Sequence, residues 1–116
     1  MSLLKKNNYV TLAVNGWLVI DKPCGITSAQ VVARVKRLLH ARKVGHAGTL
    51  DPLASGVLPV GLGEATKLMS YAMEGTKTYR FSVTFGEARD TDDAEGKVVQ
   101  SLDYLPGTDA IQAVLP

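Results

Sequence analysis

Apolar residues are spaced along the chain in a way that predicts short strands and helices separated by glycine- and proline-rich turns. Residues 16–21 (GWLVID) are a β-branched run after an Asn-Gly turn signal and predict a strand. Residues 27–30 (TSAQ) match a Thr-x-x-Gln capping box, which predicts the start of a helix that ends near Ala41. The apolar positions at helical spacing, which we expect to be buried, are Val31, Val32, Val35, Leu38 and Leu39.

The rest of the chain continues this mixed pattern. Residues 56–63 (GVLPVGLG) predict a strand, and residues 64–73 (EATKLMSYAM) predict a second helix. Residues 78–86 (TYRFSVTFG) alternate strictly, which predicts a strand paired across an acidic turn, 87–96, with residues 97–101. The buried stripe expected for the second helix is Leu68, Met69, Ala72 and Met73. The apolar face expected for the alternating strand is Tyr79, Phe81, Val83 and Phe85.

These elements predict an α+β fold with a mixed, largely antiparallel sheet and flanking helices. The 116 residues are one domain's worth, and no segment has the composition of an interdomain linker. Residues 109–116 begin an amphipathic helix whose apolar face is scarcely built when the sequence stops at Pro116. We therefore expect residues 1–116 to be the N-terminal part of a longer domain, with further elements covering its sheet.

Composition narrows the class of protein. The chain is 46% hydrophobic and 21% charged, as in globular proteins, and no apolar run approaches the roughly 20 residues of a membrane span. The N-terminal segment lacks the apolar region of a secretory signal. Cys24 is the single cysteine, so no internal disulfide is possible, and we expect a reducing, cytoplasmic setting without a membrane partner. Composition does not determine the oligomeric state.

The net charge is only +2, but it is unevenly distributed. Residues 22–50 contain six Lys or Arg residues and no acid, whereas residues 87–109 contain seven acids and two cations. A basic segment suggests an anionic partner such as a phosphate backbone. A solvated helix face that happens to be basic is the simpler explanation, and charge alone favours it.

The acidic turn suggests calcium binding, but its spacing is wrong. In a loop counted from Asp90, an EF-hand requires glycine at the sixth position and glutamate at the twelfth, which here are Glu95 and Ser101. The chain's two histidines and its cysteine also lack metal-ligand spacing. We therefore predict neither a metal nor a cofactor.

The segment 45–56 (GHAGTLDPLASG) presents a lone carboxylate, Asp51, in a glycine-rich loop. Pro52 favours an extended backbone at Asp51, and the glycines allow a tight turn close to a ligand. A Ser-His-Asp site with Ser28 or Ser55 lacks the G-x-S-x-G elbow, and glycosidase chemistry usually needs two carboxylates. Local physics alone favours an aspartate that caps the following turn.

Longer strings point to a known family. Residues from about 14 to 100 resemble, in colinear order, the N-terminal half of the TruB-type tRNA pseudouridine synthases. The matching strings are GWLVIDKPCGITSAQVVARVKRLL, KVGHAGTLDPLASGVLPVGLGEATKL, KTYRFSVTFGEARDTDDAEG and VVQ. The resemblance implies a pseudouridine synthase-like fold and isomerisation of the T-loop uridine at position 55 of tRNA. It also implies that the partner is tRNA, through its T-loop and T-stem, and that no cofactor is used.

The resemblance also implies roles for individual residues. Asp51 matches the family's essential aspartate, for which addition to the base, addition to the sugar and removal of a sugar proton all stay open. His46 matches a histidine that occupies the space left by the extruded uridine, and Tyr79 matches a tyrosine that stacks on the flipped base. Lys22 and Pro23 match a motif that supports the active-site loop. The candidates for RNA contact are Lys22, Arg34, Lys36, Arg37, Arg42, Lys43, Lys67 and Asp90, of which Lys67 and the Asp90 turn also suit a structural role.

The sequence departs from the family in length. Family members are normally more than twice as long, and their later strands supply an arginine that pairs with the catalytic aspartate. None of that lies within 116 residues, so we expect little turnover from this chain alone. The alternative is a non-catalytic tRNA-binding or RNA-folding module. The presence of Asp51 together with His46 and Tyr79 favours the enzyme.

Overall fold

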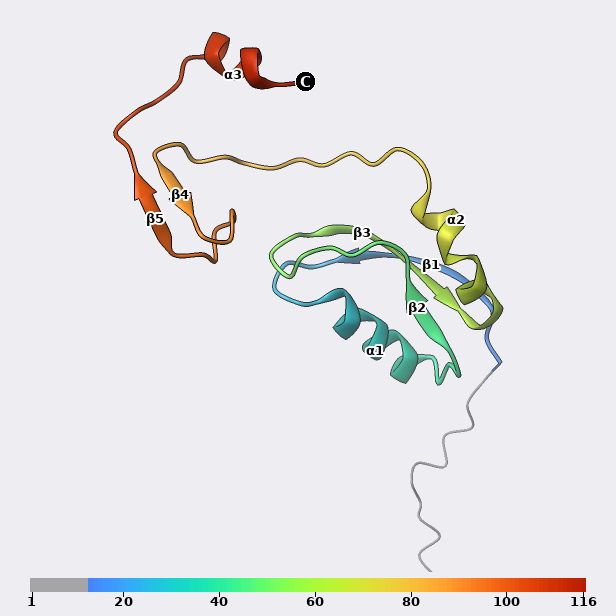
Figure 1. The fold of residues 1–116 in the computed structure, drawn as a ribbon. Coiled ribbons are helices and arrows are strands. Elements are labelled where there is room, and N and C mark those ends of the chain that lie inside the picture. Colours follow the sequence, from blue (N-terminus) through green and yellow to red (C-terminus); the bar gives the residue numbers. More distant parts are fainter. Residues whose placement is uncertain (1–12) are drawn as a thin grey trace, which may run out of the picture. The chain divides into compact units, whose positions relative to one another are not determined.

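The structure is a computed structural model that describes residues 13–116, in two compact units (Figure 1). The segment 1–12, for which the sequence predicts no secretory signal, lies outside the described residues. The first unit ends at Thr76, and the second comprises Lys77–Pro116. The elements of the first unit are β1 (Gly16–Lys22), α1 (Ser28–Leu38), β2 (Val44–His46), β3 (Gly56–Leu62), a 3-10 helix η1 (Gly63–Leu68) and α2 (Met69–Met73).

The first unit is a three-stranded antiparallel sheet with α1 packed on one face (Figure 1). The strand order is β1-β3-β2, so β3 is central. Its side chains Leu58 and Val60 are almost fully buried, and α1 contributes Val31 and Val35 to the same core. Burying a side chain of this size stabilises a fold by roughly 1.5–3 kcal/mol. The opposite sheet face is exposed; its large apolar side chains include Trp17, Val19 and Val57.

Helix α1 begins as predicted and ends earlier. The Thr27 side chain accepts a hydrogen bond from the Gln30 amide at 3.0 Å, and the Gln30 side chain accepts one from the Thr27 amide at 2.8 Å. The helix ends at Leu38 rather than near Ala41 because His40 adopts a left-handed conformation (φ 48°). The amides of His40 and Ala41 then bond back to the last turn, as in a Schellman motif. The predicted buried stripe is therefore wrong at its end, where Leu38 is exposed.

Strand β2 was not predicted, because the glycine-rich segment that starts at Gly45 has the composition of a loop. In the structure, Val44, Gly45 and His46 pair with Leu62, Gly61 and Val60 of β3. The free edge of β3 supplies hydrogen-bond partners that outweigh the weak strand propensity of these residues.

The predicted helix over 64–73 is divided in two. Its first part is the 3-10 helix η1, and only its last five residues form α2. A 3-10 helix has three residues per turn, so a stripe spaced for an α-helix turns away from the core. Leu68 and Met73, which we expected to be buried, are about half exposed, whereas Ala65 is buried.

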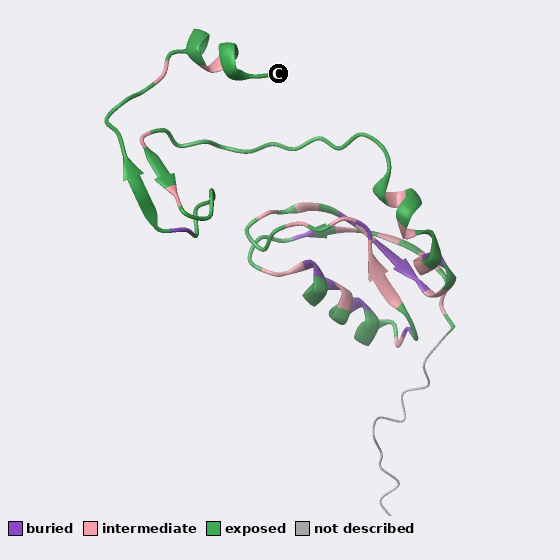
Figure 2. Cartoon of the chain, in the orientation of Figure 1, coloured by how far each residue is buried: buried purple, intermediate pink, exposed green. Residues whose placement is uncertain are grey.

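The second unit contains β4 (Glu87–Arg89), β5 (Val98–Ser101) and α3 (Thr108–Val114), and most of its residues are exposed (Figure 2). The predicted strand over 78–86 is wrong: β5 pairs with β4, inside the segment expected to be the turn. A strand needs a partner for its N–H and C=O groups. Within the described chain, residues 78–84 find none, and the apolar face expected there is exposed.

Taken separately, both units confirm an α+β fold in which every described strand pair is antiparallel. Helix α3 forms where the sequence predicted one, and it buries no side chain. None of the helices from residue 13 onward is long and apolar enough to cross a membrane.

Candidate active-site loop

Asp51 lies in the connection between the antiparallel neighbours β2 and β3. The residue is exposed, and its carboxylate forms no hydrogen bond or ion pair with the described residues. The turn that follows is closed by the backbone, since the Ala54 amide donates to the Asp51 carbonyl oxygen at 2.9 Å. The side chain of Asp51 therefore does not cap this turn, and its carboxylate is available to a ligand.

The residue before Asp51 is held by a single hydroxyl. Ser28, the first residue of α1, is buried, and its Oγ accepts a hydrogen bond from the Leu50 amide at 3.2 Å. The same Oγ donates to the Leu50 carbonyl oxygen, also at 3.2 Å. One hydroxyl can make both bonds because it carries one donor and two acceptor lone pairs.

The residue after Asp51 is held through its carbonyl oxygen. The Pro52 oxygen accepts hydrogen bonds from the Gly25 amide at 2.6 Å and from Lys22 Nζ at 3.4 Å. Lys22 is completely buried, and its ammonium also donates to the carbonyl oxygens of Pro23 and Ile26. The three donors of this ammonium are thus directed at three carbonyl oxygens. The expectation that Lys22 contacts RNA is corrected: its charge is enclosed by the backbone, and it supports the loop.

Two further features complete this arrangement, which we call the loop clamp: Lys22, Cys24, Gly25 and Ser28, holding residues 50–53. Gly25 has φ +93°, a conformation that side-chain-bearing residues rarely adopt. The Cys24 thiol donates to the Leu53 carbonyl oxygen at 3.1 Å. Every donor in the clamp comes from the connection of β1 to α1 or from the first residue of α1.

Most of the loop clamp had no signal in the sequence. Ser28 was considered there only as a nucleophile, and the positions it joins to the loop are 22 residues away. Hydrogen bonds over such distances leave no periodicity to detect. The KP motif at Lys22 and Pro23 was the single pointer to this support.

His46, at the end of β2, is half-buried. Its Nδ1 lies 2.7 Å from the Gly48 carbonyl oxygen, which can only accept, so Nδ1 carries the proton of that bond. In the neutral ring, Nε2 is then left as an acceptor. Gly48 has φ +74°, so the chain turns sharply after β2. His46 and Asp51 thus belong to one strand-loop segment, with the imidazole fixed at one nitrogen.

The basic residues of the first unit form an exposed set. All five are exposed, and no ion pair joins them to an acid in the described residues. They lie on α1 and on the connection to β2: Arg34, Lys36, Arg37, Arg42 and Lys43. Lys67 differs, since its Nζ lies 2.6 Å from Glu64 Oε2. This hydrogen bond, with the attraction of the Lys67 charge, holds the pKa of Glu64 below its ordinary value.

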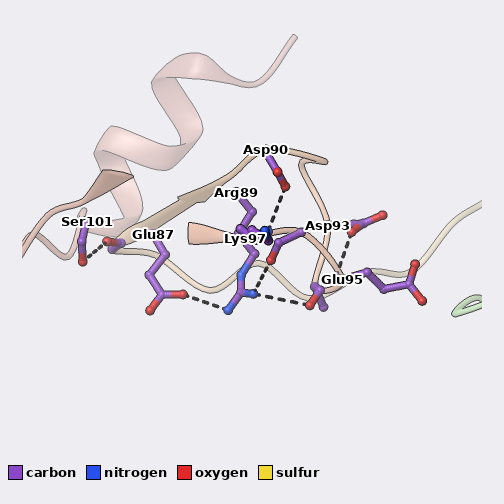
Figure 3. Close-up of polar contacts among 10 residues, drawn as sticks. Glu87, Arg89, Asp90, Asp93, Glu95, Lys97 and Ser101 are labelled. Atoms are coloured by element: carbon purple, nitrogen blue, oxygen red, sulfur yellow. Dashed lines mark hydrogen bonds and ion pairs between the residues drawn. The ribbon is translucent and has the colours of Figure 1, made fainter. Parts of the chain in front are cut away.

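Asp90 is part of a hydrogen-bonded turn in the second unit (Figure 3). Its Oδ1 accepts from the Lys97 amide at 2.8 Å, and its own amide donates to the Lys97 carbonyl oxygen at 3.0 Å. Arg89 donates to the Gly96 carbonyl oxygen at 2.8 Å. The contacts of Asp90 serve the turn, as the structural interpretation predicted.

Asp93 is held in the same turn. Its Oδ1 accepts hydrogen bonds from the Thr91 hydroxyl at 2.6 Å and from the Glu95 amide at 2.9 Å. These bonds, the hydroxyl's first, keep the pKa of Asp93 below its ordinary value. Among the described residues, no group of three or more His, Cys, Asp or Glu side chains could hold a metal ion.

Tyr79 also belongs to the second unit, in the extended segment that precedes β4. Its side chain is 68% exposed, and no hydrogen bond to it is found in the described chain. The structure therefore brings together Asp51, His46 and the loop clamp, and it does not define a site that joins them to Tyr79.

Comparison with known proteins agrees with these motifs. Residues 36–116, more than half of the chain, match the model of the TruB family pseudouridylate synthases, N-terminal domain. The chain therefore belongs to the TruB family of pseudouridylate synthases.

Relatives in two bacteria show how much of the protein is matched. A tRNA pseudouridine synthase B of Gluconacetobacter diazotrophicus is 61% identical over 89% of this chain and 34% of its own length. One of Rhodospirillum rubrum is 62% identical, over 89% and 33%. The chain thus spans about a third of the length of these relatives. A chain in the structure of an H/ACA RNP bound to a substrate RNA containing 2′-deoxyuridine is 52% identical, with a TM-score of 0.47 over 48% of this chain and 18% of that one.

Proposed function

We propose that this chain provides the catalytic aspartate of a tRNA pseudouridine synthase that isomerises the T-loop uridine at position 55. The observation that carries the proposal is Asp51 itself: an exposed carboxylate without a partner, on a loop held at both sides, in a member of the TruB family. All three roles open to the family's aspartate require a carboxylate that is free to react. We further propose that the enzyme works in the cytoplasm.

The reaction is an isomerisation. The bond between C1′ of the ribose and N1 of the uracil breaks, the base turns, and C1′ bonds to C5, whose proton is transferred to N1. No atom is gained or lost, so no cofactor is required. The part of this chain in the reaction is to present the Asp51 carboxylate to the sugar and base.

A uridine inside a folded loop must first be extruded, which costs a few kcal/mol. We assign His46 to the space that the base vacates, because its ring is fixed through Nδ1 and half-buried. We assign Tyr79 to stacking on the extruded base, which is worth roughly 1–3 kcal/mol. Together these contacts are large enough to offset the cost of extrusion.

The exposed cations of the first unit suit the tRNA backbone. Arg34, Lys36, Arg37, Arg42 and Lys43 have no ion pair that tRNA phosphates would have to displace. Phosphate contacts of this kind position an RNA without reading its sequence.

The test uses the full-length protein, because the relatives are about three times as long as the matched segment. The protein is incubated with unmodified tRNA, and pseudouridine is mapped chemically along the product. We expect modification at position 55, and its abolition by Asp51→Asn with tRNA affinity retained. The matched control is Asp21→Asn, an exposed carboxylate on β1, which should stay active.

Three outcomes would contradict parts of the proposal. An unmodified position 55 would remove the assignment of that uridine, and an entirely unmodified tRNA would remove the enzyme. Binding without modification would instead support an RNA-binding module. Loss of both binding and product in the Asp51→Asn protein would give Asp51 a structural role.

A further inference from the structure

We infer that Ser28 is a positioning residue for Asp51, and that its hydroxyl sets the orientation of the peptide that precedes the carboxylate. The catalytic part of this inference rests on the proposed function. Ser28 is 3% exposed, so it has no direct access to a substrate the size of tRNA. It acts through Leu50.

The geometry makes Ser28 more than an ordinary packing residue. Its Oγ bonds to both the amide nitrogen and the carbonyl oxygen of Leu50. The carbonyl of Leu50 belongs to the peptide group that includes the nitrogen of Asp51, and a peptide group is planar. Fixing the Leu50 oxygen therefore fixes the direction in which the backbone of Asp51 starts.

This support is connected to the rigid part of the first unit. Ser28 is the first residue of α1, and Val31 and Val35 of the same helix lie in the buried core. The Leu50 side chain packs against that core as well. The position of Asp51 is thus tied to the core by a short path: α1, the Ser28 hydroxyl, and the backbone of Leu50.

The other side of Asp51 is held independently of Ser28. The Pro52 carbonyl oxygen is bound by the Gly25 amide and by Lys22 Nζ. Removing the Ser28 hydroxyl should therefore leave the loop attached while its first half gains freedom. A displacement of about 1 Å in a reacting group can cost on the order of 100-fold in rate.

The first experiment measures hydrogen exchange of the Leu50 amide in the full-length protein. Ser28→Ala removes the acceptor, so we expect exchange to accelerate at least about tenfold under conditions where the protein stays folded. Ser28→Cys is close in size and bonds weakly, so it should lie between. The matched control is Thr27→Ala, which removes the cap of the same helix and leaves the Ser28–Leu50 bonds in place. Unchanged exchange in Ser28→Ala, or equal acceleration in the control, would overturn the inference.

The second experiment separates kcat from KM. We expect Ser28→Ala to lower kcat on the order of 100-fold while the KM for tRNA changes less than threefold, because the basic face is untouched. Thr27→Ala should keep kcat within threefold. Equal losses of kcat in both variants, or a raised KM with unchanged kcat, would assign Ser28 to helix stability or to binding instead.

The two proposals fail in distinguishable ways. If the wild-type protein forms no pseudouridine, the proposed function is wrong, and the catalytic role of Ser28 falls with it. The exchange of Leu50 then decides separately whether Ser28 holds the loop. If the wild type is active and Ser28→Ala is equally active, only the inference about Ser28 is wrong.

Discussion

The two segments that we assign to the substrate uridine are held very differently by this chain. The Asp51 loop is joined through residues on both sides of the aspartate to the start of α1 and to the connection that precedes it. The segment that contains Tyr79 lacks strand pairing in the described residues, and its aromatic rings are mostly exposed. The carboxylate is thus positioned in advance by the chain's own backbone. The tyrosine side chain stays available for contacts from outside its segment.

This difference follows from the hydrogen-bond partners available to each segment. An aspartate that takes part in bond breaking must be placed to within a fraction of an ångström, and the loop clamp supplies that placement without touching the carboxylate. A stacking ring tolerates more variation, because every base presents an aromatic face. The four predictions below test this contrast, starting with the largest expected effect.

The loop clamp should depend most on Lys22. Lys22→Met would remove the buried ammonium and leave three backbone carbonyl oxygens without that donor. We expect the free energy of unfolding to fall by about 2–4 kcal/mol. Urea unfolding of the full-length protein measures this loss.

The matched control is Lys36→Met, an exposed lysine on α1, which should change stability by less than about 0.5 kcal/mol. Equal stability of the two variants would mean that the buried ammonium does not hold the loop.

Tyr79 should contribute through its ring rather than through the fold. We expect Tyr79→Ala to lower kcat/KM about 5- to 150-fold, which corresponds to the roughly 1–3 kcal/mol of a stacked base. The melting temperature should change little, because the side chain is already 68% exposed. Tyr79→Phe should retain most of the activity that depends on stacking.

Tyr104→Ala serves as the comparison, since it removes another exposed tyrosine of the second unit. If both alanine variants lose the same activity, the effect is not specific to the Tyr79 position.

The basic face of the first unit should affect binding without affecting the chemistry. Replacing Arg37 and Lys43 by Gln should reduce the slope of log K against log salt by about 1.5–2, if each contacts one phosphate. Filter binding of tRNA over a range of salt concentrations measures this slope. Lys97→Gln, in the acidic second unit, should leave it unchanged. An unaltered slope in the double variant would exclude these two residues from the interface.

The smallest expected effect concerns the turn of the second unit. Hydrogen bonds lower the folded-state pKa of Asp93 below its ordinary value of 3.8, so its carboxylate stabilises the turn above that pH. The contribution is lost as the pH falls through the lowered pKa. Asp93→Asn should therefore unfold at a lower temperature than the wild type near neutral pH, and the difference should disappear in acid.

Asp103→Asn, for which no side-chain hydrogen bond is found in the described chain, should show no such dependence. A difference between Asp93→Asn and wild type that persists in acid would show that the ionised carboxylate is not what stabilises the turn.

Local signals were enough for several elements and for the candidate aspartate. The apolar run of β1, the Thr27–Gln30 capping box and the compact strand β3 each depend on neighbouring residues, and all three form as predicted. The family motifs likewise identified Asp51 without reference to any contact.

What depended on distant partners could not be predicted from local pattern. Strand β2 forms because the edge of β3 accepts it, and residues 78–84 form no strand because the described chain offers them no partner. The end of α1 was misplaced because His40, rather than a glycine, takes the left-handed position.

The sequence by itself thus determined the family, the strands β1 and β3, the start of α1 and the identity of the exposed carboxylate. Only the tertiary structure decided how that carboxylate is held. Lys22, predicted both as an RNA contact and as a support of the loop, is buried against carbonyl oxygens, and Ser28, considered only as a nucleophile, orients the Leu50 peptide. The physical reason is that hydrogen bonds to the backbone depend on chain geometry across 22 to 30 residues and place few demands on the side chains they join.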